Sequence, residues 1–335
     1  MKKQIAIGID IGGTHTVIGV VDKNGQILQE LKPSIKTPAK SLNPNNDKYI
    51  SEKLLTEYMS EVYSAIRWII SEVKKSEPEI QIVGIGIGAP NGCFYSGEIE
   101  QAPNLPFVGN VKVVEKIANE FPDIDKVKLT NDANAAAIGE LIYGGAKGMK
   151  DFAMVTLGTG VGSGFVVNGQ VLYGKDGFAG EFGHTVIVPN GRMCGCGING
   201  HLEAYCSASG IVRTYFELMA FNNVKNAALA DVPFDKLTPY DIFLAANNND
   251  KTAIETFNRT GEILGIGFAN IVHYFSPEAI FLFGGVTAAG DYLLKPSVKA
   301  MEDNLLPGFK NKVKVLLSSL PDSSAAILGA SALVW

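Results

Sequence analysis

The first 31 residues alternate hydrophobic and polar positions in the manner of short strands. Residues 4–13 place isoleucine at every second position and end in a glycine pair, which predicts a strand followed by a tight turn. Further strands are predicted over residues 16–22 and 27–31. Between them, Asn24-Gly25 favours a two-residue hairpin turn, because both residue types tolerate a positive φ angle. The chain therefore opens on three consecutive strands.

Helical and strand patterns then alternate along the chain. Residues 32–48 carry three prolines and several asparagines and are predicted to form a loop. Asn131 or Asp132 is expected to cap an alanine-rich helix that ends at Gly144. The alternation of the two patterns indicates an α/β fold. Helices are predicted over residues 50–75, 111–121 and 132–144, and strands over residues 81–90 and 126–130.

The chain beyond residue 200 is mostly helical in pattern. A buried strand there ends at Gly284-Gly285, and a closing helix is expected to be capped by Asp322 or Ser323. Helices are predicted over residues 207–220, 238–248, 251–274 and 322–334, and strands over residues 279–286 and 312–319.

One stretch of the chain repeats the pattern of another. Residues 8–28 and residues 155–172 both read as a strand, a turn rich in glycine and threonine, a second strand, an Asn-Gly turn and a third strand. The turns begin at Gly12 and Gly158, and 158 − 12 gives a spacing of 146 residues, about half the chain. Two related halves would each contribute one glycine turn to a cleft. The alternative is that two unrelated hairpins look alike.

Composition and charge exclude several classes of protein. The 335 residues suggest about two domains. The net charge of −5 and the lack of a Lys/Arg block disfavour nucleic-acid binding. No apolar run approaches the ~20 residues that a membrane span needs, and Asp10 interrupts the first apolar stretch too early for a signal peptide. We therefore expect a cytoplasmic protein without membrane or nucleic-acid partners.

The glycine content, 37 of 335 residues or about 11% against a usual ~7%, suggests turns that approach a ligand closely. No P-loop motif occurs, and the glycine runs only half match the dinucleotide fingerprint. The turns Gly12-Gly13-Thr14 and Gly158-Thr159-Gly160 instead offer backbone N–H groups to an anion. Neither turn contains a lysine, so a metal ion would have to neutralise bound phosphate. Asp10 could orient Mg²⁺ there, unless it is only a carboxylate at a strand end.

A second carboxylate, Asp132, follows Asn131 at the start of the alanine-rich helix. Helix capping would explain it equally well. A carboxylate in that position stays ionised beside the helix terminus and can still accept a proton. Asp132 is therefore a candidate general base toward a substrate hydroxyl, since phosphoryl transfer needs mainly positioning and a proton acceptor.

A third group of residues resembles a zinc site. His184, Cys194, Cys196 and His201 supply two imidazoles and two thiols within 18 residues. This set suits tetrahedral Zn²⁺, and four protein ligands would make the role structural. Isolated cysteines are commonly small buried hydrophobes instead. The neighbouring carboxylates, Glu181 and Glu203, could accept hydrogen bonds from a polyol.

The whole chain resembles the repressor, open-reading-frame and sugar kinase (ROK) family of the actin and hexokinase-like ATPase superfamily. The resemblance rests on five motifs in order: DIGGTHT, NDANAAAIGE, LGTGVGSG, GEFGH and CGCGINGHLEAYCSASGI. It implies an α/β protein with the actin-like, ribonuclease H-like fold, whose two domains close over ATP, Mg²⁺ and a hexose. The implied division is a small domain over residues 1–130, with residues 322–335 packing back on it, and a large domain over 131–321 that carries the zinc loop.

The resemblance also assigns roles to residues. Asp132 falls on the position of the catalytic base, which takes the proton of the sugar's 6-hydroxyl. His201 stands where the family usually has a third cysteine; imidazole is a competent zinc ligand, so we expect the site to survive. The implied sugar contacts are Asn104, Asn131, Glu181, His184 and Glu203, and the implied nucleotide positions are Gly12, Gly13, Thr14, Thr159, Gly160, Gly284 and Gly285.

The expected activity is ATP-dependent phosphorylation of a hexose, with glucose favoured. N-acetylmannosamine, N-acetylglucosamine and fructose are the alternatives within the family. A sugar-responsive repressor is the alternative from another class. It is disfavoured because Gly8 and Asp10 already lie in the first strand, and because Asp132 is retained. The resemblance further suggests a homodimer.

Overall fold

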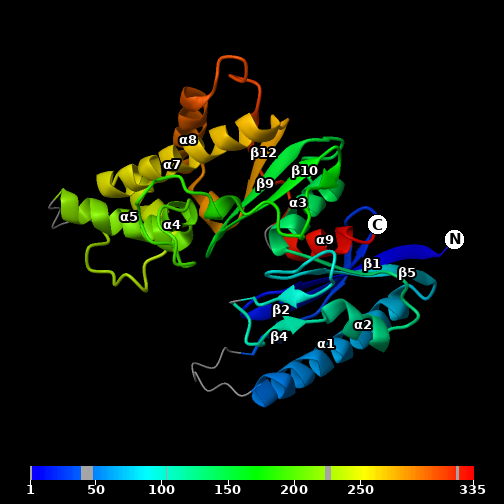
Figure 1. Cartoon of the computed structure of the whole chain (residues 1–335). Coiled ribbons are helices and arrows are strands. Elements are labelled where there is room, and N and C mark those ends of the chain that lie inside the picture. Colours follow the sequence, from blue (N-terminus) through cyan, green and yellow to red (C-terminus); the bar gives the residue numbers. More distant parts are fainter. Residues whose placement is uncertain (1, 39–47, 103, 223–227, 322–323) are drawn as a thin grey trace. The chain divides into compact units, whose positions relative to one another are not determined.

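The computed structural model describes residues 2–38, 48–102, 104–222, 228–321 and 324–335 (Figure 1). The expected caps Asp322 and Ser323 lie outside these residues. The chain divides into two compact units, each of which is discontinuous in sequence. The first unit comprises Met1–Gly148, Val171–Ala179 and Ser319–Trp335, and the second comprises Met149–Gln170 and Gly180–Ser318.

The first unit is built on a mixed sheet with the strand order β3-β2-β1-β5-β8. The β1–β2 and β2–β3 pairs are antiparallel, whereas β5 pairs parallel with both β1 and β8. A short strand, β4, pairs with β2. The strands are β1 (Lys3–Ile11), β2 (His15–Asp22), β3 (Ile27–Glu30), β4 (Ile35–Lys36), β5 (Ile80–Gly88) and β8 (Val127–Thr130), and β6 (Ile99–Glu100) pairs separately with β7 (Asn110–Val111).

The turn between β2 and β3 is one residue longer than predicted. Gly25 N–H donates to the carbonyl of Asp22, and Asp22 N–H donates to the carbonyl of Gln26. Gly25 alone has a positive φ here, because Asn24 is not in the left-handed region. The Asp22 carboxylate accepts hydrogen bonds from the N–H groups of Asn24 and Gln26. The two-residue prediction was therefore wrong: this is a three-residue turn held by a side chain.

The two faces of this sheet are covered by different helices. The isoleucines at odd positions of β1 pack with one face of α1 (Lys48–Ser76) in a single apolar core. The even positions face the short helix α9 (Ala325–Ala332). Because Gly8 and Gly86 carry no side chain, the α9 backbone lies directly against β1 and β5. The remaining helices of this unit are α2 (Val113–Glu120) and α3 (Asp132–Tyr143).

Gly86 is the glycine at which this close packing has the largest expected effect on stability. A Cβ atom there would overlap the backbone carbonyl oxygen of Ala330. We expect Gly86→Ala to lower the free energy of unfolding by at least about 3 kcal/mol, because two backbones would have to separate. Gly308→Ala is the matched control, since a Cβ there meets nothing within 4 Å. Urea unfolding of both variants measures the difference, and equal midpoints would refute the packing argument.

The second unit repeats the sheet of the first. Its strand order is β11-β10-β9-β12-β13, with β9–β10 antiparallel and β12 parallel to both β9 and β13. This is the order of β3-β2-β1-β5-β8, so the predicted internal repeat is confirmed. Asn168 and Gly169 both have positive φ, so this hairpin does have the two-residue turn. The strands are β9 (Phe152–Leu157), β10 (Val161–Val167), β11 (Gln170–Val171), β12 (Ala279–Phe283) and β13 (Lys314–Leu317).

The short helical segments 182–184, 203–206 and 285–289 are not predicted, whereas the longer helices of the second unit follow the predictions. The exception is residues 287–311, where no helix is predicted. The structure has helix α8 (Asp291–Asn304) there, with Pro296 inside it. Glycines of α7 give α8 room, because a Cβ at Gly261 would meet the Pro296 ring 2.6 Å away. The others are η1 (Phe182–His184), α4 (Glu203–Cys206), α5 (Ala208–Phe221), α6 (Pro239–Asn247), α7 (Lys251–Phe275) and η2 (Gly285–Ala289).

The boundary between the units differs from the expected one. A break between residues 130 and 131 is predicted, but residues 131–148 belong to the first unit. The reason is the packing of α3 against α9, where a Cβ at Gly139 would lie 2.9 Å from the Cα of Gly329. Residues 319–335 belong to the first unit as well. Among the described residues, no helix combines the length and the apolar character that a membrane crossing requires.

Candidate active site and metal-binding cluster

Two carboxylates lie where three parallel strands of the first unit end. Asp10 pairs with Gly88 across β1 and β5, and Gly88 pairs with Thr130 of β8. Helix α3 begins at Asp132, just after β8. A Cβ at Gly88 would lie 3.3 Å from Asp10 Oδ1 and 3.9 Å from the Cα of Asp132. The two carboxylates are therefore neighbours, and Gly88 leaves open the space between them.

Both carboxylates have a raised pKa. Burial, reinforced by the charge of Asp132, raises the pKa of Asp10 to about 7. The protein around Asp132 displaces water from its carboxylate and raises its pKa as well, although a hydrogen bond from Ala133 N–H partly opposes this. A carboxylate with a raised pKa is a better proton acceptor than an ordinary one.

The raised pKa of Asp10 predicts how stability depends on pH. Between pH 4 and pH 7 the folded chain holds a proton on Asp10 that the unfolded chain has lost, so stability decreases as the pH rises through this range. In metal-free buffer we expect the free energy of unfolding to fall by on the order of 1–3 kcal/mol, after allowance for the partial exposure of the side chain. Thermal unfolding at several pH values measures this.

Asp10→Asn should flatten that dependence and be more stable than the wild type at pH 8, because the amide carries no charge. Asp123→Asn, at an exposed position, is the control and should leave the dependence unchanged. A wild-type stability that rises between pH 4 and pH 7, with no difference in Asp10→Asn, would contradict the burial of this charge.

The predicted nucleotide turn of the first unit is held by Thr37. Its hydroxyl donates to the carbonyl of Gly12 at 2.7 Å, and its N–H donates to the carbonyl of Thr14. Asn104 lies beside the turn, since a Cβ at Gly13 would be 3.0 Å from its carbonyl oxygen. The first unit thus brings a predicted sugar contact next to a predicted nucleotide turn.

Asn131 is the N-cap of α3. Its side-chain oxygen accepts a hydrogen bond from Ala133 N–H at 2.9 Å. Of the two candidate caps, the structure therefore selects Asn131, and Asp132 is the first helical residue. The Asp132 carboxylate also accepts a hydrogen bond from Ala133 N–H, through Oδ1 at 2.8 Å.

In the second unit the predicted nucleotide residues gather where β9 and β12 end. Thr159 and Gly160 follow β9, and Gly284 follows its parallel neighbour β12. Gly284 has a φ of 107°, and a Cβ there would overlap the carbonyl of Leu157. Gly285 is open, with nothing within 4 Å of a Cβ. Glycine is thus required at position 284 for the backbone to turn beside β9.

Glu203, the first residue of α4, connects the turn at residues 158–160 with the loop that carries Cys194 and Cys196. Its Oε2 accepts a hydrogen bond from Val161 N–H at 3.0 Å, and its Oε1 accepts one from the Cys194 thiol at 3.4 Å. Glu181 precedes η1, and its Oε2 lies 4.0 Å from His184 Nε2. The second unit therefore brings both predicted sugar-contacting carboxylates close to the His/Cys cluster.

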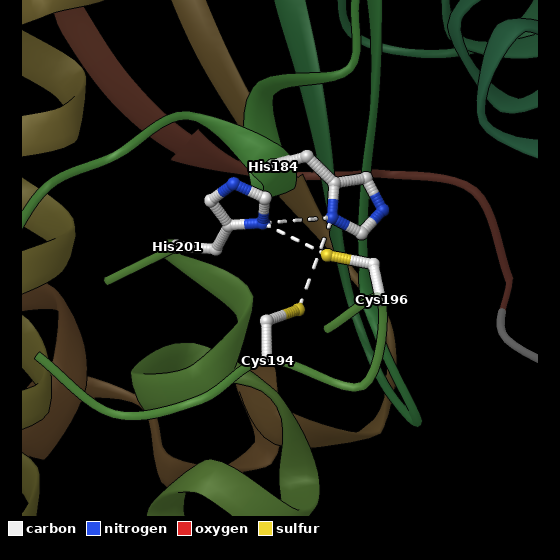
Figure 2. Close-up of side chains that lie close together, drawn as sticks. All are labelled: His184, Cys194, Cys196 and His201. Carbon is white, nitrogen blue, oxygen red and sulfur yellow. Dashed lines mark hydrogen bonds between the residues drawn. The ribbon is translucent and has the colours of Figure 1, made fainter. Parts of the chain in front are cut away.

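The four predicted metal ligands form one cluster (Figure 2), with all ligand atoms within 4.8 Å of one another. His184 Nδ1 lies 3.4 Å from His201 Nδ1 and 3.9 Å from Cys194 Sγ. Cys196 Sγ lies 3.2 Å from His201 Nδ1. Figure 2 shows the two rings and the two sulfur atoms pointing toward a common centre.

These separations fit a tetrahedral zinc ion. Bonds of about 2.3 Å to sulfur and about 2.0–2.1 Å to nitrogen place neighbouring ligand atoms roughly 3.3–3.8 Å apart. Burial raises the pKa of the Cys194 thiol to about 11 in the metal-free chain, so zinc binding would release a proton. Cys206 is not part of the cluster, since its thiol is buried and donates to the carbonyl of Thr260.

Sequence reasoning missed two residues that support these sites. Thr37 lies in the proline-rich loop, where no motif marks it. Arg192 lies two residues before Cys194, and its side chain reaches into α4 and α5. The sequence marks Arg192 only by its position two residues before a predicted metal ligand, because its side-chain contacts form on folding.

The two sheets have the same strand order, and a glycine turn follows β1 in one and β9 in the other. This arrangement defines a protein of the actin-like ATPase class. The chain belongs to the ROK family, which it matches over residues 6–335. It is 33% identical to a glucokinase of Thermotoga maritima, over 100% of this chain and 98% of that protein.

One similar structure is the crystal structure of a ROK family glucokinase from Streptomyces griseus in complex with glucose and AMPPNP. It is 29% identical, with a TM-score of 0.76, over 98% of this chain and 99% of that one. The chain is also 28% identical to a xylose repressor of Caldicellulosiruptor bescii, over 98% of this chain and 77% of the repressor. The fold expected from the motifs is confirmed by these matches.

Proposed function

We propose that this chain is an ATP-dependent hexokinase that phosphorylates glucose at its 6-hydroxyl group. The observation that carries the proposal is the pair of neighbouring carboxylates at the strand ends of the first unit, one of them at the start of α3 with a raised pKa. The full-length similarity to glucokinases supports the choice of reaction and of sugar.

Asp132 acts as the general base in the proposed reaction. Its carboxylate accepts the proton of the 6-hydroxyl while the 6-hydroxyl oxygen attacks the γ-phosphorus of ATP and the bond from that phosphorus to ADP breaks. A proton acceptor is needed for this transfer but not for sugar binding alone. An aspartate at position 132, the family's catalytic-base position, therefore favours a kinase over a sugar-responsive repressor.

The glycine turns hold the nucleotide in this proposal. Backbone N–H groups of Gly13 and Thr14 are proposed to bind phosphate oxygens, whereas Gly12 N–H donates to the His15 carbonyl and so shapes the turn. Thr159 and Gly160 are the corresponding proposed nucleotide positions of the second unit. Gly285, with nothing within 4 Å of a Cβ, would give the nucleotide close access to the backbone after β12, and Gly284 makes the turn beside Leu157 that presents it. Mg²⁺, when bound, neutralises phosphate charge, and the Asp10 carboxylate suits it as a hard oxygen ligand or as an acceptor for its waters.

The proposed sugar contacts are polar side chains. Asn104, Asn131, Glu181, His184 and Glu203 would bind its hydroxyl groups. Glu203 accepts a hydrogen bond from Val161 N–H, so its carboxylate is oriented before the sugar arrives.

The His/Cys cluster is proposed to hold one structural Zn²⁺. His184, Cys194, Cys196 and His201 fill a tetrahedral shell, which leaves no open position for substrate. The metal would stabilise the loop that carries Glu203, so its removal should weaken sugar binding.

A turnover screen tests the proposed function. The purified chain is assayed with ATP and Mg²⁺ against glucose, fructose, N-acetylglucosamine and N-acetylmannosamine, with ADP release coupled to NADH oxidation. We expect the largest kcat/KM with glucose. ADP release with N-acetylmannosamine and none with glucose would overturn the assigned sugar, and no turnover with any hexose would overturn the kinase assignment.

We also propose that the chain is a cytoplasmic homodimer in which glucose phosphorylation feeds glycolysis. The assembly rests on the family resemblance, and the compartment rests on cysteines that are free in the structure and suited to metal. Light scattering on the purified chain would give twice the monomer mass of 35.7 kDa. A monomer at micromolar concentration would refute the dimer.

A further inference from the structure

Arg192 is the most extensively bonded side chain next to the metal-binding cluster. Its guanidinium donates to the carbonyls of Ala204 and Gly210 and to the Thr214 hydroxyl, at 3.0–3.3 Å. It also pairs with the Glu217 carboxylate at 2.6 Å. Only 10% of the side chain is exposed. A planar guanidinium with this many partners is held in one orientation.

The backbone of Arg192 also links the segment before Cys194 to the segment around His201. Its carbonyl accepts a hydrogen bond from Gly200 N–H at 2.8 Å, next to the ligand His201. Its N–H donates to the Tyr205 hydroxyl at 2.7 Å, and its guanidinium lies over the Tyr205 ring at 4.6 Å. Arg192 thus connects the segment that leads to Cys194 with the segment that carries His201 and with helix α4.

We propose that Arg192 is a positioning residue for the metal: it fixes the loop on α4 and α5 so that Cys194, Cys196 and His201 are in place before zinc binds. The inference rests on the zinc site of the proposed function. Groups that orient metal ligands typically contribute 10–100-fold to metal affinity. An ordered loop lowers the entropy cost of binding, because the ligands are not collected from a flexible segment.

Arg213 offers a matched control. It pairs with the same carboxylate, Glu217, at 2.9 Å, but it is 46% exposed and lies on α5. No contact described for it reaches the metal-binding loop. Arg192→Met keeps the apolar part of the side chain and removes the guanidinium, and Arg213→Met makes the same change without touching the loop.

The test is the zinc dissociation constant of the full chain, measured by competition with a chromogenic chelator and zinc ion. We expect Arg192→Met to bind zinc about 10–100-fold more weakly than the wild type, and Arg213→Met to remain within about 2-fold. Arg192→Lys should recover only part of the affinity, since an ammonium lacks the planar set of donors.

Unfolding temperatures with and without zinc separate positioning from a general loss of stability. A purely structural residue would lower both by similar amounts and leave the dissociation constant unchanged, which would overturn the inference. If Arg192→Met fails to fold, Thr214→Val tests the role of Arg192 instead, because it removes a hydroxyl that accepts hydrogen bonds from two guanidinium N–H groups. We expect Thr214→Val to weaken zinc binding about 3- to 10-fold, and unchanged affinity would refute the role.

The two proposals fail differently. A wild-type chain that binds no zinc would overturn the metal site and, with it, the role of Arg192. A wild-type chain that binds one zinc ion, with equal affinity in Arg192→Met, would overturn the role of Arg192 alone. Neither result depends on catalytic turnover.

Discussion

Asp132→Asn is expected to lower kcat by about 10²- to 10⁴-fold, the range that a positioned general base contributes. The amide keeps the shape of the side chain but is a very poor proton acceptor. Its oxygen can still accept the hydrogen bond from Ala133 N–H, so helix α3 should begin at the same residue. Glucose binding should therefore change by only a few fold, and the loss should appear in kcat rather than in KM.

The measurement combines steady-state kinetics with calorimetric titration of glucose. Asp125→Asn, an exposed site of the same unit, controls for the chemical change and should keep wild-type kcat. An Asp132→Asn chain that turns over at the wild-type rate would remove Asp132 from the mechanism.

His201→Ala is expected to weaken zinc binding by about 10²- to 10³-fold. Structural zinc sites bind with about 10–16 kcal/mol, and an equal share for one of four ligands gives a loss of this size. The ring is 4% exposed, and its Nδ1 lies 3.2 Å from Cys196 Sγ and 3.4 Å from His184 Nδ1. Removing the imidazole leaves one corner of the coordination tetrahedron without a protein ligand.

Metal analysis after dialysis should find about one zinc per wild-type chain and much less in His201→Ala. His273→Ala, outside the cluster on α7, should retain the metal. The glucose KM of His201→Ala should rise, because Glu203, a proposed sugar contact, begins helix α4 only two residues after His201. Full zinc retention in His201→Ala would exclude His201 from the ligand set.

Much of the fold follows from periodicity and turn residues, and the two hairpins show where this reasoning fails. Both contain Asn-Gly, yet only Asn168-Gly169 forms the two-residue turn. In the first hairpin the Asp22 carboxylate accepts two backbone N–H groups and stabilises a longer turn. The preference of a dipeptide for one turn type is outweighed here by the hydrogen bonds that a neighbouring side chain accepts.

Helix α8 and the boundary between the units could not be predicted without knowing which helices pack against each other. Pro296 inside a helix is unfavourable locally, and α8 forms because glycines of α7 allow close packing. Residues 131–148 belong to the first unit because α3 meets α9 through Gly139 and Gly329. The sequence does not reveal which segment packs against these glycines.

The candidate site was predictable where its residues are close in sequence. The ligand set His184, Cys194, Cys196 and His201 is local, and the structure clusters it. Thr37 and Arg192 act on backbone groups brought near by folding, so no spacing rule identifies them. The roles assigned to the sugar and nucleotide residues remain predictions for the variants above to test.

Helix α9 also has a consequence for how the chain is made. It covers β1 and β5, the strands whose Gly8 and Gly86 receive its backbone. During translation these strands leave the ribosome long before residues 325–332 exist. The part of the sheet that α9 covers therefore stays uncovered until residues 325–332 have been synthesised. Nascent chains released earlier would expose that face to chaperones and to aggregation.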